Sequence, residues 1–420
     1  MANEIEYLPR VVDDTVSRQL RAAGAVLIRG PKGCGKTETA KRFSQSEIVI
    51  DDSLAVMQAM NTDPSILLQG ETPRLVDEWQ EQKAFWNVIR HAVDERRAKG
   101  QFILTGSANP PDEVNTHSGV GRFGVVNMRT MTQAELGNST NEVSLSSVLA
   151  GNSFSSGNRE PDIGWLASTM VIGGWPANIG LEEPDALLNN SNYLDLLVEV
   201  DVSRVSEKRR DPQKMRQLLR SLSRNTSEES SYTTLAADVF SDNPTLAKDT
   251  VMDYLDVLAR VMIVDDLPAW STHIQSRASL RKAPKRHLAD VSLACSALAL
   301  NSTRLLDDLV FLGKLFESLV IHDLKVYAEK MDARLLHYRD SSGREADAIM
   351  EFRDGSWAAF EIKLGFGAVD DGAASLTEFA KNIDTKKVGE PKALVVIPAF
   401  GFAHTRKDNT KVIPFSTLCE

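Results

Sequence analysis

Eight consecutive residues near the N-terminus match the phosphate-binding pattern G-x-x-x-x-G-K-[ST] in full. They are Gly30, Pro31, Lys32, Gly33, Cys34, Gly35, Lys36 and Thr37. Glycines let backbone N–H groups turn inward around phosphate oxygens, and the N-terminus of a helix that follows favours anions. Lys36 is expected to reach the β- and γ-phosphates, and Thr37 is expected to hold Mg²⁺. The segment therefore predicts a site for ATP and Mg²⁺ that all eight residues line.

A pair of acidic residues follows a short apolar run in Arg74-Leu75-Val76-Asp77-Glu78-Trp79-Gln80. A buried strand that ends in Asp-Glu places one carboxylate near the metal ion and the second near the water that attacks the γ-phosphate. We therefore assign Asp77 to the metal ion and the nucleotide, as a Walker B aspartate, and Glu78 to the polarisation of water. The alternative is that both carboxylates are simply solvated at the end of a strand.

A polar residue is also expected to sense the γ-phosphate from the end of the strand beside Asp77. The segment Phe102-Ile103-Leu104-Thr105-Gly106-Ser107-Ala108-Asn109 supplies two choices, of which Ser107 is preferred and Asn109 is the alternative. An ordinary turn at the end of a strand explains the same residues equally well.

A second set of residues suited to metal chemistry lies in the C-terminal part of the chain. Three strands are predicted there, at 335–339, 345–351 and 357–363. A turn centred on Asp354 would set Asp347 opposite Glu361, and Lys363 would share a face with Glu361 because side chains alternate along a strand. Two carboxylates that converge with a lysine can hold Mg²⁺ for phosphodiester cleavage. The alternative is a cross-strand salt bridge.

Two α/β parts are predicted to carry these residues. Strand-like and helix-like segments alternate over the first part, which predicts a parallel sheet. Its predicted strands are 25–29, 48–50, 75–76, 102–104 and 124–128, and its predicted helices are 36–45 and 82–97. The second part starts near residue 304 with a long amphipathic helix, continues through the three strands above, and ends in a helix and a buried strand at 393–397.

The chain between these parts is predicted to be mainly helical. Residues 138–160 are rich in Ser, Asn and Gly and predict a loop or linker that leads into a helical lid. The next segment predicts a winged-helix-like module with a short strand at 261–264. Its last helix carries three aspartates that would repel phosphates, so a protein contact is preferred over DNA contact by the basic stretch 277–286. The predicted domains are 1–137, 138–206, 207–303 and 304–420.

Composition limits the function further. The chain has 420 residues and a formal net charge of −10, which predicts several globular domains and argues against a dominant non-specific nucleic-acid binder. Apolar runs are too short to cross a bilayer, and the N-terminal residues do not form a signal peptide, so we expect no membrane partner and a cytoplasmic location. Three widely spaced cysteines argue against a disulfide scaffold.

Taken together, the motifs resemble the AAA+ ATPases and, more narrowly, a widespread bacterial and archaeal family of uncharacterised ATP-binding proteins. The resemblance is carried by GPKGCGKT, LVDEWQ, ILTGS, Gly121-Arg122, the Gly173-Gly174-Trp175-Pro176 element and the C-terminal segments. It implies ATP hydrolysis, with Arg122 as an arginine finger on the γ-phosphate, including that of a neighbouring subunit, and with Arg129 as the rival. A surface salt bridge is the plainer explanation of either arginine.

The C-terminal residues resemble the PD-(D/E)XK nuclease pattern through Asp347 and Glu361-Ile362-Lys363. This resemblance implies an α/β nuclease-like domain in which Glu317, Asp347 and Glu361 hold a metal ion and Lys363 is catalytic. Two functions stay open. In the first, the nucleotide state controls Mg²⁺-dependent cleavage of DNA or RNA. In the second, the chain is a nucleotide-gated protein-interaction module, alone or as a homo-oligomer, with an inactive nuclease-like scaffold.

Overall fold

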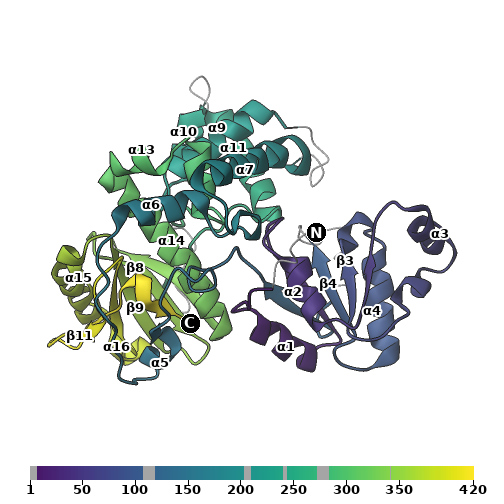
Figure 1. Ribbon diagram of the computed structural model, residues 1–420, viewed down its shortest axis with the longest axis horizontal. Coiled ribbons are helices and arrows are strands. Elements are labelled where there is room, and N and C mark those ends of the chain that lie inside the picture. The colour runs from purple at the N-terminus through teal and green to yellow at the C-terminus, as the bar shows by residue number, and fades with distance from the viewer. Residues whose placement is uncertain (1–6, 107–118, 203–209, 240–243, 272–282, 341) are drawn as a thin grey trace. The chain divides into compact units, whose positions relative to one another are not determined.

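The computed structural model of this protein describes residues 7–106, 119–202, 210–239, 244–271, 283–340 and 342–420. The chain forms two compact units, and Figure 1 colours it from purple at the N-terminus to yellow at the C-terminus. The first unit comprises residues 1–130 with 260–262, and the second comprises residues 131–259 with 263–420. Within the described residues, no helix is both long enough and apolar enough to span a bilayer.

A five-stranded parallel sheet forms the centre of the first unit (Figure 1). Its strands are β1 (Ala25–Arg29), β2 (Ser46–Val49), β3 (Arg74–Asp77), β4 (Phe102–Gly106) and β5 (Phe123–Asn127). Their spatial order is β2-β3-β4-β1-β5, and every neighbouring pair is parallel. This confirms the predicted parallel α/β sheet. Because β4 lies between β1 and β3, the residues that follow these three strands come together at one edge of the sheet.

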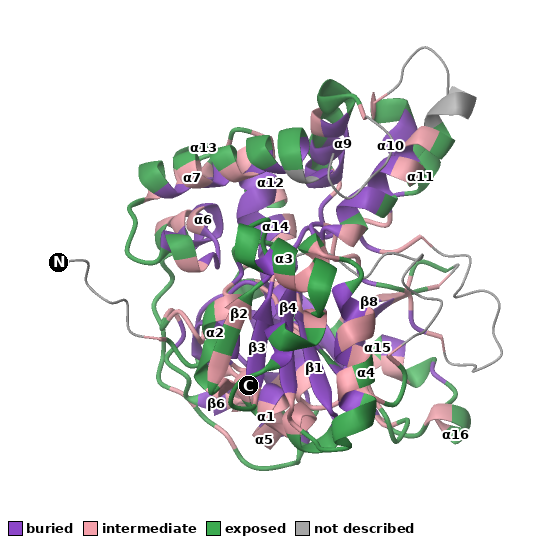
Figure 2. Ribbon diagram, turned by 90° about the vertical axis from the view of Figure 1, so that its right-hand side faces the viewer, coloured by how far each residue is buried: buried purple, intermediate pink, exposed green. Residues whose placement is uncertain are grey.

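Helices cover both faces of this sheet, which explains why its central strands β1, β3 and β4 are buried without alternation. The helices are α1 (Asp13–Ala22), α2 (Lys36–Phe43), α3 (Leu54–Thr62) and α4 (Phe85–Arg96). Leu27 of β1 belongs to a core cluster that includes Phe85 and Ile89 of α4, whereas its neighbour Ile28 belongs to a second cluster that includes Ala40 of α2. Strands β1, β3 and β4 are accordingly almost entirely buried (Figure 2). Each large apolar side chain buried here contributes about 1.5–3 kcal/mol.

The segments predicted as lid, winged-helix-like module and nuclease-like domain all belong to the second unit. Its helical part comprises α5 (Leu145–Leu149), α6 (Ile163–Ile172), α7 (Glu183–Leu196) with a π-helical turn (Leu197–Asp201), α9 (Pro212–Arg224), α10 (Tyr232–Val239), α11 (Pro244–Arg260), α12 (Val291–Ala297) and α13 (Ser302–Leu306). Aspartates begin three of these helices. The side chains of Asp162, Asp211 and Asp290 each accept a backbone N–H of the first turn of α6, α9 and α12.

The Ser/Asn/Gly-rich segment 138–160 is more than the loop that was predicted. It contains strand β6 (Val143–Ser144), which pairs in parallel with β13 (Leu418–Cys419), and helix α5. Val143, Leu145 and Val148 are almost completely buried. A few apolar side chains therefore determine the structure of this polar segment, because burial of each one in the core lowers the free energy of the folded state.

Residues 263–267 and 285–289 run antiparallel after α11. Leu267 and Lys285 exchange two backbone hydrogen bonds of 2.9 and 3.0 Å. The short strand predicted at 261–264 is observed as this hydrogen-bonded pair, shifted toward the C-terminus. Helices α9, α10 and α11 followed by such a pair are compatible with a winged-helix-like module, which stays a prediction.

A six-stranded sheet forms the C-terminal part of the second unit, in the order β11-β12-β10-β9-β8-β7. Its elements are α14 (Leu309–Lys330), β7 (Ala333–Arg339), β8 (Glu345–Phe352), β9 (Trp357–Lys363), α15 (Val369–Lys381), α16 (Thr385–Val388), β10 (Leu394–Pro398), β11 (His404–Thr405) and β12 (Lys411–Val412). Strands β7, β8 and β9 form an antiparallel meander, and β10 runs parallel to β9. Ala348 faces Phe360 and Glu351 faces Trp357, so the register is centred on Asp354 as predicted.

The Gly173-Gly174-Trp175-Pro176 element is a structural clamp within the second unit. The Gly174 N–H donates to the carboxylate of Asp290 at 2.9 Å, and its carbonyl accepts the N–H of Met131 at 2.7 Å. A Cβ on Gly174 would lie 2.3 Å from the Met131 carbonyl oxygen. The element therefore needs glycine for close packing between three distant segments.

We expect Gly174→Ala to lower the free energy of unfolding of the second unit by about 1–3 kcal/mol, the usual cost of forcing an extra methyl group into a packed site. Urea denaturation followed by tryptophan fluorescence measures the change. Gly313→Ala is the matched control, because Gly313 lies in α14 with open space around its Cβ position. That helical substitution should be neutral or stabilise by up to about 1 kcal/mol. Equal effects of the two substitutions would contradict the clamp.

Candidate functional site

The phosphate-binding loop connects β1 to α2 and takes its shape from glycines. Gly33 and Gly35 have φ angles of 80° and 101°, a region that residues with a side chain rarely adopt. A Cβ on Gly30 would lie 2.1 Å from the Met128 carbonyl oxygen, so this position also requires glycine. Helix α2 begins directly after the loop at Lys36, which leaves the N–H groups of its first turn available to an anion.

Lys36 and Thr37 lie where the loop meets the end of β3. The buried Lys36 ammonium donates to the carbonyl oxygens of Gly30 and Pro31 at 3.0 and 2.9 Å. Thr37 Oγ1 lies 3.1 Å from both carboxylate oxygens of Asp77. A hydroxyl and a carboxylate thus come together as oxygen ligands of the kind that Mg²⁺ prefers, so the residues present fit this metal ion.

Neighbouring side chains hold the acidic end of β3. Thr105 of β4 pairs with Asp77 in the parallel register and donates its hydroxyl to Asp77 Oδ1. Gln80 donates to the carboxylate of Glu78. Burial raises the pKa of Glu78 above its ordinary value, although the hydrogen bond from Gln80 opposes this shift. A raised pKa makes the Glu78 carboxylate a better proton acceptor.

Two residues that hold this site were missed by sequence reasoning. The Arg10 guanidinium donates to the carbonyl oxygens of Cys34 and Arg129 at 3.0 and 2.9 Å, and so ties the loop to the segment after β5. Thr105 had a recognisable signal, a hydroxyl at the end of a buried strand. Arg10 had none, because its two acceptors are brought together only by the fold.

Arg122 lies at the wrong edge of the sheet for the nucleotide site of its own subunit. It directly precedes β5, its carbonyl accepts N–H bonds from Gly24 and Ala25 at the start of β1, and its side chain pairs with Asp94. The phosphate-binding loop follows the opposite end of β1. Arg122 is therefore not brought to the phosphate-binding loop of its own subunit, and its assignment as an arginine finger, including one on a neighbouring subunit, stays a prediction.

Of the other residues predicted for this site, only Arg129 lies in the described part of the chain. Arg129 follows β5, at the same edge as the loop. Ser107 and Asn109 lie outside the described residues, so their assignment as sensors stays a prediction.

The C-terminal acids come together, but around a lysine that the prediction did not include. Lys285 Nζ lies 2.8 Å from Glu317 Oε1 of α14 and 3.1 Å from Asp347 Oδ1 of β8. Lys363 Nζ of β9 lies 2.7 Å from Glu361 Oε1. The exposed fractions of Lys285, Asp347 and Glu361 are 6%, 5% and 3%. Ammonium groups therefore compensate the carboxylates in a mostly buried cluster, in which the Lys363 side chain is 31% exposed.

Burial and mutual repulsion shift the protonation of this cluster. Burial, and then the charge of Asp347, raise the pKa of both Glu317 and Glu361 to about 8. Burial lowers the pKa of Lys285, but the carboxylates of Asp347 and Glu317 raise it by more. Within the described part of the chain, no group of three or more His, Cys, Asp or Glu side chains has the geometry to hold a metal ion. Because Lys285 occupies the space between the carboxylates, the residues as arranged do not fit the predicted metal ion.

The described end of the basic stretch 277–286 is buried and does not form a solvated face. Lys285 is enclosed by the acids above. Arg286 is 3% exposed, pairs with Asp266 and donates to the Ser230 carbonyl at 3.0 Å. Neither side chain is exposed to a nucleic acid, and residues 277–282 lie outside the described part.

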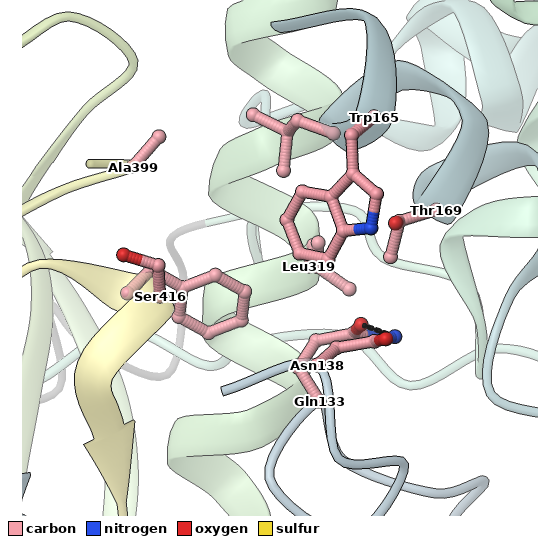
Figure 3. Close-up of a pocket in the computed structure, with 9 residues that line it drawn as sticks. Gln133, Asn138, Trp165, Thr169, Leu319, Ala399 and Ser416 are labelled. Atoms are coloured by element: carbon pink, nitrogen blue, oxygen red, sulfur yellow. Dashed lines mark hydrogen bonds between the residues drawn. The ribbon is translucent and has the colours of Figure 1, made fainter. Parts of the chain in front are cut away.

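A small pocket in the second unit is too small for a substrate. Figure 3 shows its lining, which comes from Gln133, Asn138, Trp165, Leu166, Thr169, Leu319, Ala399, Phe415 and Ser416. Asn138 donates to the side-chain carbonyl of Gln133 at 2.8 Å beneath the Trp165 ring. The pocket has a volume of about 10 Å³, which leaves room for about one water molecule.

Protein-family comparisons match three successive regions of the chain. Residues 22–137 match the family model described as an AAA domain. Residues 164–304 and 312–418 match two domains of unknown function, DUF8612 and DUF4143. No curated protein matches the chain. The first unit is thus an AAA-type ATP-binding domain.

Two solved structures are similar to part of this chain. The Walker-type ATPase PABY2304 of Pyrococcus abyssi is 12% identical, with a TM-score of 0.42 over 70% of this chain and 97% of that protein. A DNA replication initiation factor is 13% identical, with a TM-score of 0.27 over 60% of this chain and 90% of that protein. Neither similarity is strong enough to support a function.

We expect Thr105→Val to weaken the use of Mg·ATP, because Asp77 Oδ1 loses its hydroxyl donor. A hydrogen bond to a charged group is worth about 1.5–3 kcal/mol, so the KM for Mg·ATP should rise about tenfold or more. Steady-state ATPase assays at varied Mg·ATP measure it. Thr39→Val is the matched control, because the buried Thr39 hydroxyl contacts Tyr7 and not Asp77. An equal rise in both variants would contradict a specific role for Thr105.

Proposed function

We propose that the first unit binds ATP with Mg²⁺ and hydrolyses its γ-phosphate. The observation that carries this proposal is the 3.1 Å contact between Thr37 of the phosphate-binding loop and Asp77 of the adjacent acidic strand end. The match to an AAA domain over residues 22–137 supports it independently.

Each residue of the loop has a distinct task in this proposal. The glycine-shaped backbone surrounds the phosphates, and the Lys36 ammonium exchanges its two carbonyl acceptors for phosphate oxygens. Thr37 and Asp77 would hold Mg²⁺, which neutralises charge on the phosphates when bound. Arg10 keeps the loop in place through the Cys34 carbonyl.

Glu78 is the proposed general base. Its carboxylate directly follows Asp77, and burial raises its pKa, which favours acceptance of a proton from the attacking water. Gln80 orients the carboxylate through its hydrogen bond. Arg122 is assigned to the γ-phosphate of a second copy of this chain, since its own site lies at the opposite edge of the sheet.

We expect Lys36→Ala to abolish ATP binding and Glu78→Gln to retain binding while kcat falls by about 10²–10⁴-fold. The first change removes the cation at the phosphates, and the second removes the base while keeping its shape. Isothermal titration calorimetry measures binding, and phosphate release measures turnover. Lys41→Ala is the matched control, since Lys41 is an exposed lysine of α2 that pairs with Glu38. Unchanged ATP affinity in Lys36→Ala would overturn the site assignment.

For the second unit we propose a scaffold that acts in nucleotide-gated binding of a partner. The ion pairs of Lys285 with Glu317 and Asp347 support this interpretation over an active nuclease, because the carboxylates are already compensated. The second candidate, Mg²⁺-dependent cleavage of DNA or RNA controlled by ATP, is favoured by the convergence of Glu361 and Lys363 beside Asp347.

We expect the purified chain to cleave neither single- nor double-stranded DNA or RNA with Mg²⁺ or Mn²⁺, with or without ATP, because Lys285 already engages the carboxylates of Glu317 and Asp347. Gel assays on labelled substrates test this, with Glu361→Gln and Lys363→Ala as controls for contaminating nucleases. Cleavage that is lost in both variants would instead establish the nuclease.

A further inference from the structure

Lys285 lies at the centre of the C-terminal carboxylate cluster. Its ammonium contacts Glu317 on α14 and Asp347 on β8 at 2.8 and 3.1 Å. The second oxygen of Asp347 accepts the Ile362 N–H at 2.9 Å, so both Asp347 oxygens are engaged. A cation that bridged Glu317 and Asp347 would need the space that the ammonium fills.

The backbone of Lys285 is fixed by its own module and not by the sheet that it enters. Lys285 exchanges backbone hydrogen bonds with Leu267, and Arg286 exchanges them with the segment 227–228 at 2.9 and 3.0 Å. Lys285 lies in the region that matches DUF8612, residues 164–304. Its partners Glu317 and Asp347 lie in the region that matches DUF4143, residues 312–418. Hydrogen bonds within its own module therefore hold the backbone of Lys285, while its ammonium reaches the acids of α14 and β8.

Charge balance makes Lys285 and a divalent cation alternatives. The cluster holds three carboxylates, those of Glu317, Asp347 and Glu361, against two ammonium groups, those of Lys285 and Lys363. A divalent cation in place of Lys285 would favour ionisation of Glu317 and Glu361, and together with Lys363 it would balance the three resulting negative charges. Glu361 is 3% exposed, and its Oε2 atom has no hydrogen-bond partner among the described residues, so one buried acceptor is left for such a cation.

We propose that Lys285 is the resident cation of this cluster and that its ammonium excludes a divalent metal ion from Glu317, Asp347 and Glu361. The site is therefore closed to metal by a residue of the adjacent module, and removal of that one charge opens it. This inference rests on the proposed scaffold role of the second unit and is independent of the ATP site.

The test is calorimetric titration of the nucleotide-free full chain with MnCl₂. We expect Lys285→Met to bind one Mn²⁺ that the wild type does not bind, or binds at least about tenfold more weakly. The reason is that the carboxylates of Glu317 and Asp347 then lack their counter-cation. Combining Lys285→Met with Glu361→Gln should remove this binding. Lys363→Met is the matched control and should gain no Mn²⁺, because Lys285 still fills the space between Glu317 and Asp347.

Two results would overturn the inference. One is a folded Lys285→Met variant that binds no additional Mn²⁺. The other is wild-type binding of Mn²⁺ that Glu361→Gln abolishes. Circular dichroism establishes whether each variant folds. If Lys285→Met unfolds, the double variant Lys285→Met with Glu317→Gln, which conserves the net charge, provides a second test. In that variant Asp347 and Glu361 should take up Mn²⁺. Because ATP is absent throughout, these outcomes are distinguishable from failure of the proposed ATPase.

Discussion

Parallel pairing of β1, β3 and β4 is the constraint on which the nucleotide site depends. In a parallel sheet all carboxyl ends meet at one edge, so the loop after β1 and the acids after β3 become neighbours although 40 residues separate Thr37 from Asp77. The intervening strand β4 sets the spacing and supplies the Thr105 hydroxyl to Asp77. The same constraint excludes Arg122 from this edge, because it precedes its strand.

The second unit faces a different physical problem, which is the cost of burying charge. Transfer of a carboxylate or an ammonium group out of water costs several kcal/mol per ion unless a partner compensates it. Around β8 and β9 the compensation comes from Lys285 and Lys363. The sequence pattern of carboxylates and a lysine on these strands is thus that of a metal site, whereas the contacts in the structure are those of buried ion pairs.

Several features of both sites were predictable because they depend on local chemistry. The glycines of the loop, the carboxylates after β3 and the register centred on Asp354 follow from rules about neighbours in the chain. The roles of Arg10 and Lys285 were not predictable, since each acts on residues far away in the sequence. The buried strand β6 within a polar segment was equally unpredictable, because it forms only by pairing with β13 at the other end of the chain.

The amino-acid sequence by itself determined the phosphate-binding loop, the acidic strand end and the α/β character of the first unit, because these are properties of residue type and short spacing. Tertiary structure alone decided that Arg122 lies at the edge opposite the phosphate-binding loop and that Lys285 compensates Glu317 and Asp347. Electrostatic interactions depend on distance in space and on burial, and neither quantity is encoded in the spacing of residues along the chain.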